Sequence, residues 1–168
     1  MTITMYQASV PVFQRTLKAL DVILDKAAAY AAERKIDPTV LLTARLYPDM
    51  FALTRQVQIA TDHAKGASAR LAGVAVPSFA DTEATVPDLK ARIAKTLEFI
   101  ASVKPAQIDG SEGRDISLKA GPRELNFKGQ DYLLFFALPN FYFHVTTAFA
   151  ILRHNGVPVG KLDFLGAV

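Results

Sequence analysis

The sequence predicts an all-α protein: one domain, residues 1–168, folded as an antiparallel four-helix bundle with a small β-hairpin between its third and fourth helices. Two observations favour this class. Apolar residues recur every three or four positions over several long segments, which is the period of a helix with one buried face. Hydrophobic residues also make up 51% of the 168 residues, enough for a substantial core. Helices of this kind most simply bury their apolar faces together.

The first helix is expected over residues 9–34, with Pro11 in its first turn and Ser9 as its N-cap. Asp37-Pro38 is a start signal for the second helix, which should extend to about residue 71 and end at Gly73. Pro48 lies inside this second pattern. It predicts either a kink or a short helix ending near residue 47, followed by the main one.

The second half of the chain begins with a loop over residues 74–86. Thr85-Val86-Pro87-Asp88 then resembles a capping box and predicts the start of the third helix. Lys104-Pro105 ends that helix. Two polar–apolar alternating segments, 115–119 and 123–128, predict the hairpin. The fourth helix should cover residues 129–153, broken or kinked at Pro139.

Charge and composition exclude several classes of protein. The net charge is +3 and scattered, without basic runs, so no nucleic-acid partner is expected. The absence of cysteine excludes disulfides and thiolate sites. Residues 1–12 do not resemble a signal peptide, and a cytoplasmic location is expected. Residues 132–152 carry no Asp, Glu, Lys or Arg and are long enough to span a bilayer, but Pro139, Asn140 and His144 favour a buried helix of a soluble bundle over a membrane span.

Four polar residues of the second helix repeat every seven positions: Asp49, Gln56, His63 and Arg70. On a helix this spacing forms one line beside the apolar stripe, roughly 30 Å long at ~1.5 Å per residue. Such a line either reaches into the interior of a bundle or forms a half-solvated boundary row. The sequence leaves both interpretations open.

Histidine 144 of the fourth helix lies among aromatic residues. A buried imidazole needs a partner at each ring nitrogen, so His144 is either a core residue bonded to a hydroxyl or carboxylate, or a metal ligand or general base. His154, at the end of the same helix, is interpreted as structural or exposed, where a cationic ring would favour the helix dipole.

Several short motifs resemble a family of uncharacterised bacterial proteins classed as a domain of unknown function. That family is similar to the DinB/YfiT-like superfamily of four-helix bundles. The motifs are Met5-Tyr6-Gln7, Leu46-Tyr47-Pro48-Asp49-Met50, Gly129-Gln130-Asp131-Tyr132-Leu133, Leu138-Pro139-Asn140-Phe141-Tyr142-Phe143-His144 and Gly160-Lys161-Leu162-Asp163-Phe164-Leu165-Gly166.

The resemblance implies a homodimer and a divalent metal, zinc or nickel, held by one His of the second helix and an H-x-x-x-H motif in the fourth. His63 and His144 match the first two ligands, but Ala148 stands where the third should be. Zinc sites of this type need three protein ligands. Asp62 points about 100° away from His63 on the helix, and Asp49 is two heptads distant. No tight metal is therefore expected, and no other cofactor.

Three functions remain open, and no catalytic residue is assigned. The first is a non-catalytic or cryptically catalytic bundle that binds a small anionic ligand in a pocket between the second and fourth helices. Its expected lining is His63, His144, Tyr142, Asn140, Arg70, Gln56 and Asp49. The second is a metal-dependent hydrolase or thiol transferase that uses His63 and His144. The third is a homodimeric interaction module in which helical faces and the Phe164-Leu165 tail contact a second subunit.

Overall fold

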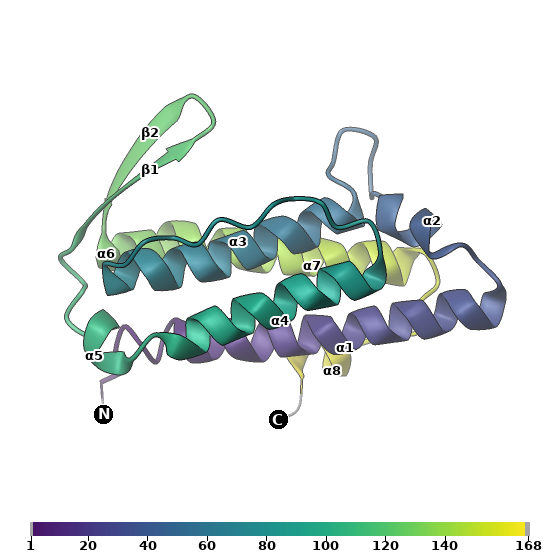
Figure 1. Ribbon diagram of the computed structural model, residues 1–168, viewed down its shortest axis with the longest axis horizontal. Helices are drawn as coiled ribbons and strands as arrows, with labels where there is room; N and C mark the ends of the chain where they lie inside the picture. Colours follow the sequence, from purple (N-terminus) through teal and green to yellow (C-terminus); the bar gives the residue numbers. More distant parts are fainter. Residues whose placement is uncertain (1, 167–168) are drawn as a thin grey trace.

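Helices dominate the computed structural model, which describes residues 2–166. Four long helices, α1, α3, α4 and α7, lie along its long axis, and a two-stranded antiparallel hairpin projects from one end (Figure 1). This confirms the prediction of a mostly helical chain with a small hairpin. The elements are α1 (Val10–Arg34), α2 (Pro38–Thr43), α3 (Leu53–Ala72), α4 (Val86–Ser102), α5 (Pro105–Ile108), β1 (Asp115–Ala120), β2 (Arg123–Lys128), α6 (Gly129–Asp131), the π-helix η1 (Tyr132–Ala137), α7 (Leu138–His154) and α8 (Lys161–Leu165).

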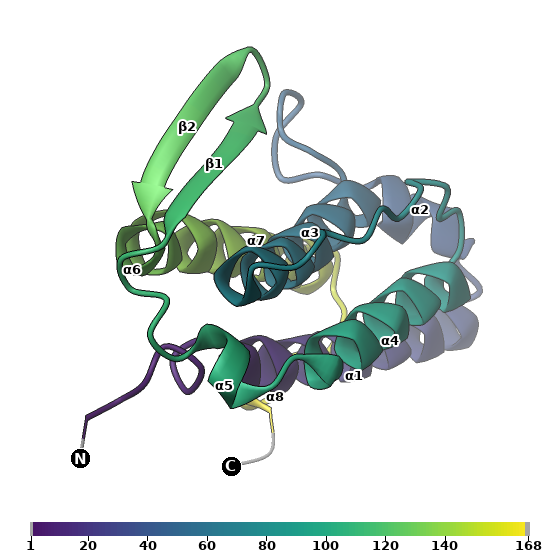
Figure 2. The same ribbon diagram turned by 60° about the vertical axis from the view of Figure 1, so that its left-hand side comes forward.

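The long helices do not alternate in direction along the chain. Helix α3 packs against both α7 and α4, and α1 packs against α4. Residues 74–85 return along the length of the molecule between α3 and α4, so that these two neighbours run the same way (Figures 1 and 2). The predicted antiparallel order is therefore wrong for this pair. Twelve extended residues reach roughly 40 Å, more than the ~26 Å length of the 17-residue α4.

The predicted second helix is two helices. Asp37 caps α2 by accepting a hydrogen bond from the Thr39 amide at 2.9 Å, as its sequence signal indicated. Helix α2 ends at Thr43, and α3 begins only at Leu53. Residues 44–52, which include Pro48, are not helical. The alternative of a short helix followed by the main one is therefore confirmed, although the short helix ends at Thr43 and not near residue 47. Gly73 ends α3 with a φ of 71°.

The remaining start and stop signals hold, except for the predicted capping by Ser9. Thr85 and Asp88 form a reciprocal capping box at the start of α4, with distances of 3.2 and 2.9 Å. In the hairpin, Asp115 pairs with Lys128 and Ala120 with Arg123. Ser9 stands at the N-cap position of α1, but its hydroxyl donates back to the Met5 carbonyl at 2.6 Å instead of capping the helix.

Instead of the break or kink predicted at Pro139, the chain forms a π-helix immediately before this residue. Proline lacks an N–H, and its ring clashes with the carbonyl one turn earlier in a regular α-helix. Helix η1 widens the turn just before Pro139, after which α7 continues as an α-helix. A side chain helps to satisfy the backbone here, because Asn140 Nδ2 donates to the Phe136 carbonyl at 2.7 Å.

The segment Gly129–His154 is long and apolar enough to cross a membrane by length and composition. A core helix of a soluble protein passes the same test, so the segment is weak evidence for a span. Its inner face, including Phe141 and Ala148, is fully buried. Its outer face is not buried, contrary to the prediction, and exposes several large apolar side chains.

The C-terminal tail packs partly on the helices. Phe164 lies against Phe149, with ring centroids 5.8 Å apart, whereas Leu165 is 41% exposed. Asp163 of α8 accepts a hydrogen bond from Lys26 of α1 at 2.6 Å, which ties the tail to the first helix.

Candidate functional site

Helix α3 presents three of the four predicted heptad residues. Gln56, His63 and Arg70 all lie on it. Seven residues make almost two full turns of an α-helix, with a difference of only about 20°, so the three side chains share one face. Asp49 does not continue this line, because it lies in the exposed loop that precedes α3. The prediction of a four-residue helical line including Asp49 is wrong for that residue.

His63 and His144 are neighbours across the contact between α3 and α7. Their rings stack with centroids 5.9 Å apart and planes inclined by 15°. The sequence therefore identified two residues that the fold brings together.

The hydrogen bonds of Gln56 determine which nitrogen of His144 carries the proton. Buried Gln56 donates from Nε2 to the Phe51 carbonyl at 3.0 Å, which leaves Oε1 as an acceptor 2.7 Å from His144 Nδ1. Nδ1 of His144 is therefore protonated, and Nε2 holds the lone pair of the neutral ring. Of the two partners expected for a buried His144, one is this side-chain amide rather than a hydroxyl or carboxylate.

Both imidazoles are held neutral. The pKa of His63 is lowered to about 4. Burial is the main cause, and the lowering effect of the nearby His144 is larger than the raising effect of Asp62. Burial, followed by the charge of Arg55, also lowers the pKa of His144. Within residues 2–166, the only buried side-chain polar atom without a hydrogen bond is Ser111 Oγ. Both ring nitrogens of His63 and Nε2 of His144 therefore have no hydrogen-bond partner in this part of the chain without being fully enclosed.

Arg70 is fixed one helical turn beyond Gly66. Its Nη1 donates to the Tyr132 hydroxyl at 3.1 Å, and its guanidinium carbon lies 6.0 Å from the centroid of the Tyr132 ring. A Cβ atom at position 66 would meet Nη1 at 2.5 Å, so the glycine leaves room for this head group. None of the ion pairs within residues 2–166 involves Arg70.

A partly open cavity of about 500 Å³ contains His63 and Arg70 in its wall. Helix α3, the hairpin and the η1–α7 segment each contribute to it. The lining residues are Arg55, Ile59, Asp62, His63 and Arg70 of α3, Leu118, Lys119 and Gly121 of the hairpin region, and Tyr132, Phe136 and Asn140.

Apart from Asp49, which lies in the loop before α3, the predicted pocket residues divide into three groups. His63, Arg70 and Asn140 line the cavity, while Gln56 and His144 pack behind His63. Tyr142 lies elsewhere, 40% exposed on the outer face of α7, because two residues on a helix turn about 200° from His144. Arg55, Lys119 and Phe136 were not predicted. Phe136 lies one turn before Asn140, a spacing that could have revealed it.

The charge of the cavity wall is positive. It carries Arg55, which is itself paired with Asp81, together with Arg70 and Lys119, against one carboxylate in the wall, Asp62. That carboxylate is already paired with Lys65 and with Arg92, whose Nη2 lies 2.8 Å from Asp62 Oδ1.

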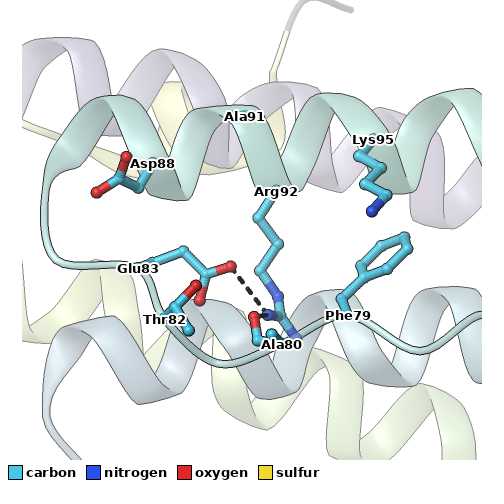
Figure 3. Close-up of a pocket in the computed structure, with 8 residues that line it drawn as sticks. All are labelled: Phe79, Ala80, Thr82, Glu83, Asp88, Ala91, Arg92 and Lys95. Atoms are coloured by element: carbon cyan, nitrogen blue, oxygen red, sulfur yellow. Dashed lines mark hydrogen bonds and ion pairs between the residues drawn. The ribbon is translucent and has the colours of Figure 1, made fainter.

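Arg92 belongs to a separate cavity of about 390 Å³ between α4 and residues 79–83 (Figure 3). Its side chain is buried, bonds Glu83 at 3.0 Å and lies near Asp81 at 3.0 Å. The ring of Phe79 faces the cations of Lys65, Arg92 and Lys95. The charges of these groups are already compensated by one another. We therefore interpret them as a structural ion network that holds residues 79–83 on α3 and α4.

The residues present do not supply the metal-ligand set that the resemblance implies. Ala148 is fully buried at the third position, and Asp62 is engaged by two cations. Across residues 2–166, no three His, Cys, Asp or Glu side chains are grouped so as to hold a metal ion. His63 and His144 alone do not form a three-ligand zinc or nickel site.

Comparison with known proteins supports a shared fold. The chain is similar to a DinB family member protein from Shewanella denitrificans, whose crystal structure superimposes with a TM-score of 0.87 at 42% identity. That match covers 97% of this chain and 92% of the other. No functionally curated protein matches the sequence. The pattern of the domain of unknown function DUF1993 matches residues 5–165, so the chain belongs to the DUF1993 family.

Proposed function

We propose that this DinB-like protein is a four-helix bundle that binds a small anionic ligand in the cavity between α3, η1 and the hairpin. The single observation that carries the proposal is Arg70. Its guanidinium lines the cavity, is positioned by Tyr132 and Gly66, and takes part in none of the ion pairs formed among residues 2–166.

The chemistry of the other lining groups supports a carboxylate or phosphate. A guanidinium donates paired N–H groups that match the geometry of both anions. Lys119 adds a second cation, and neutral His63 can donate or accept one hydrogen bond. A volume of about 500 Å³ is within the usual range for small-molecule sites.

Binding is favoured over acid–base catalysis. An efficient general base has a pKa near the operating pH, whereas the pKa of His63 is about 4. At neutral pH, this ring is a hydrogen-bonding group with little tendency to take up a proton. We therefore assign no catalytic role to His63 or His144.

Isothermal titration calorimetry with inorganic phosphate and with acetate tests the proposal. The parent protein should bind at least one of the two anions, and Arg70→Gln should weaken that binding by about tenfold or more, as expected for loss of a charged hydrogen bond. The matched control is Arg153→Gln, which changes an exposed arginine at the end of α7. Equal binding by Arg70→Gln and the parent, or no binding of either anion at millimolar concentration, would contradict the proposal.

A second candidate function is assembly with another copy of the chain. Four large apolar side chains are exposed on η1 and α7: Leu134 (41%), Phe135 (74%), Tyr142 (40%) and Phe143 (56%). We call them the apolar outer face. No charged residue occurs between positions 132 and 152, so this face would meet its own symmetry copy without charge repulsion. Homodimerisation is compatible with ligand binding on the opposite side of η1.

A further inference from the structure

The anion-binding cavity has an aromatic corner beside Arg70. His63 and Phe136 both line it and meet nearly edge to face, with centroids 5.8 Å apart and planes inclined by 61°. Neither ring is fully buried. A planar group placed in such a corner contacts the face of one ring and the edge of the other.

Both rings of the corner are held from behind. The ring of His63 stacks on His144, which is fixed by Gln56. Phe136 stacks on fully buried Tyr132 at 5.9 Å and contacts Phe127 of β2 at 5.3 Å. Rings supported in this way present a preorganised surface, so a ligand orders few side chains when it binds.

The π-helix connects the aromatic corner to the cation. Tyr132 and Phe136 both belong to η1, and Tyr132 is also the residue that accepts a hydrogen bond from Arg70. Burial raises the pKa of Tyr132, so its phenol stays neutral and does not repel an anion at Arg70. One turn of helix therefore places the guanidinium and the aromatic surface side by side.

We propose that the preferred ligand carries its anionic group on a single planar aromatic ring, as an aromatic carboxylate or an aryl phosphate does. The anion would bind Arg70 and the ring would pack against Phe136 and His63. This inference rests on the proposed anion binding and adds the chemical class of the group that bears the charge.

Paired ligands test the aromatic preference in the parent protein. Calorimetric titrations would compare benzoate with acetate and with cyclohexanecarboxylate, and phenyl phosphate with inorganic phosphate. We expect benzoate to bind about tenfold more tightly than acetate because of the additional aromatic contacts. Benzoate should also bind at least about threefold more tightly than cyclohexanecarboxylate, whose ring is of similar size but not planar. Benzoate no tighter than acetate would overturn the inference and leave the anion site intact. No binding by any of the five ligands would overturn both proposals.

A pair of variants tests the location of the contact. Phe136→Leu should lower the ratio of benzoate affinity to acetate affinity severalfold, because it removes the ring against which benzoate packs. Phe135→Leu is the matched control, because this neighbouring ring is 74% exposed and does not line the cavity. Circular dichroism checks that both variants fold, and Phe136→Met replaces Phe136→Leu if the latter does not. Retention of the full benzoate preference without the Phe136 ring would overturn the proposed location.

Discussion

At the scale of single residues, His63 and Gly66 of α3 each reduce stability locally and contribute to the cavity. Burial of His63 lowers its pKa to about 4, so folding disfavours the protonated ring. Gly66 gives up helix propensity in the middle of α3, about 1 kcal/mol relative to alanine, and leaves space for Arg70. Both effects predict measurable behaviour that the rest of the helix should not share.

The pKa of His63 predicts how stability depends on pH. Between pH 6.5 and about 4 the unfolded chain holds a proton on this ring that the folded chain lacks. His63 therefore does not reduce the free energy of unfolding above pH 6.5. As the pH drops from 6.5 to about 4, the free energy of unfolding decreases, by at most about 3 kcal/mol from this residue. Urea unfolding at several pH values should show that the free energy of unfolding decreases less with falling pH for His63→Gln than for the parent. His154→Gln, at an exposed position, should follow the parent. Parallel curves for all three proteins would refute the assignment.

Gly66→Ala separates stability from binding. Alanine favours the helix by about 1 kcal/mol, but its Cβ would lie 2.5 Å from Arg70 Nη1. The flexible end of Arg70 should move away and lose its bond to Tyr132. We expect a thermal midpoint equal to or above that of the parent, together with phosphate or acetate affinity weakened severalfold. Ala69→Gly, on the same helix, should lower the midpoint instead. Unchanged anion affinity in Gly66→Ala would show that the position of Arg70 does not matter.

Sequence spacing identified part of this site for a physical reason. Gln56, His63 and Arg70 share one helix, on which a seven-residue repeat maps directly to one face. Arg55 and Lys119 could not be predicted, because Arg55 falls outside that repeat and Lys119 comes from the hairpin. Asp49 was included wrongly because the repeat was extended across Pro48 into a segment that is not helical.

At the scale of elements, local signals specified ends better than interiors. The capping box of Thr85 and Asp88 and the αL glycine at position 73 act within one turn, so the sequence reveals them. The π-helix before Pro139 packs on α3 and, through Tyr132 and Phe136, on Phe127 of the hairpin, which are contacts that no local pattern shows. Proline indicates an interruption there, but not whether the helix breaks, bends or widens.

Residues 74–85 depend on a tertiary ion network that no local pattern contains. Arg92 is buried and bonds Asp62 and Glu83 from a different helix and a loop. Removing one partner from such a network leaves uncompensated charge. Arg92→Met should lower the free energy of unfolding by about 3 kcal/mol and increase hydrogen exchange in residues 74–85. The control, Lys18→Met, removes an exposed cation of α1 outside this network and should change little. Wild-type exchange in Arg92→Met would contradict this role.

At the scale of the whole molecule, helix directions were the part that sequence could not determine. The loop at residues 74–85 is long enough either to make a wide antiparallel turn or to return along the full length of α4, and both would bury the same apolar stripes. The ion network around Arg92 accompanies the second arrangement, in which α3 and α4 run in the same direction (Figure 1). It connects Thr61 and Asp62 of α3 with the first half of α4.

The apolar outer face gives the last prediction, which concerns assembly. Exposed Phe135 and Phe143 belong to a helical segment without charged residues, and burying them against a second copy would remove apolar area from water. Light scattering should therefore report a size that rises from monomer to dimer with concentration, and the double variant Phe135→Lys/Phe143→Lys should remain monomeric. Leu162→Lys places a charge on the 78% exposed tail residue of α8 and should dimerise like the parent. A parent protein that stays monomeric at high micromolar concentration would refute the interface. Dimers disrupted only by Leu162→Lys would move it to the tail, because the two surfaces belong to different helices.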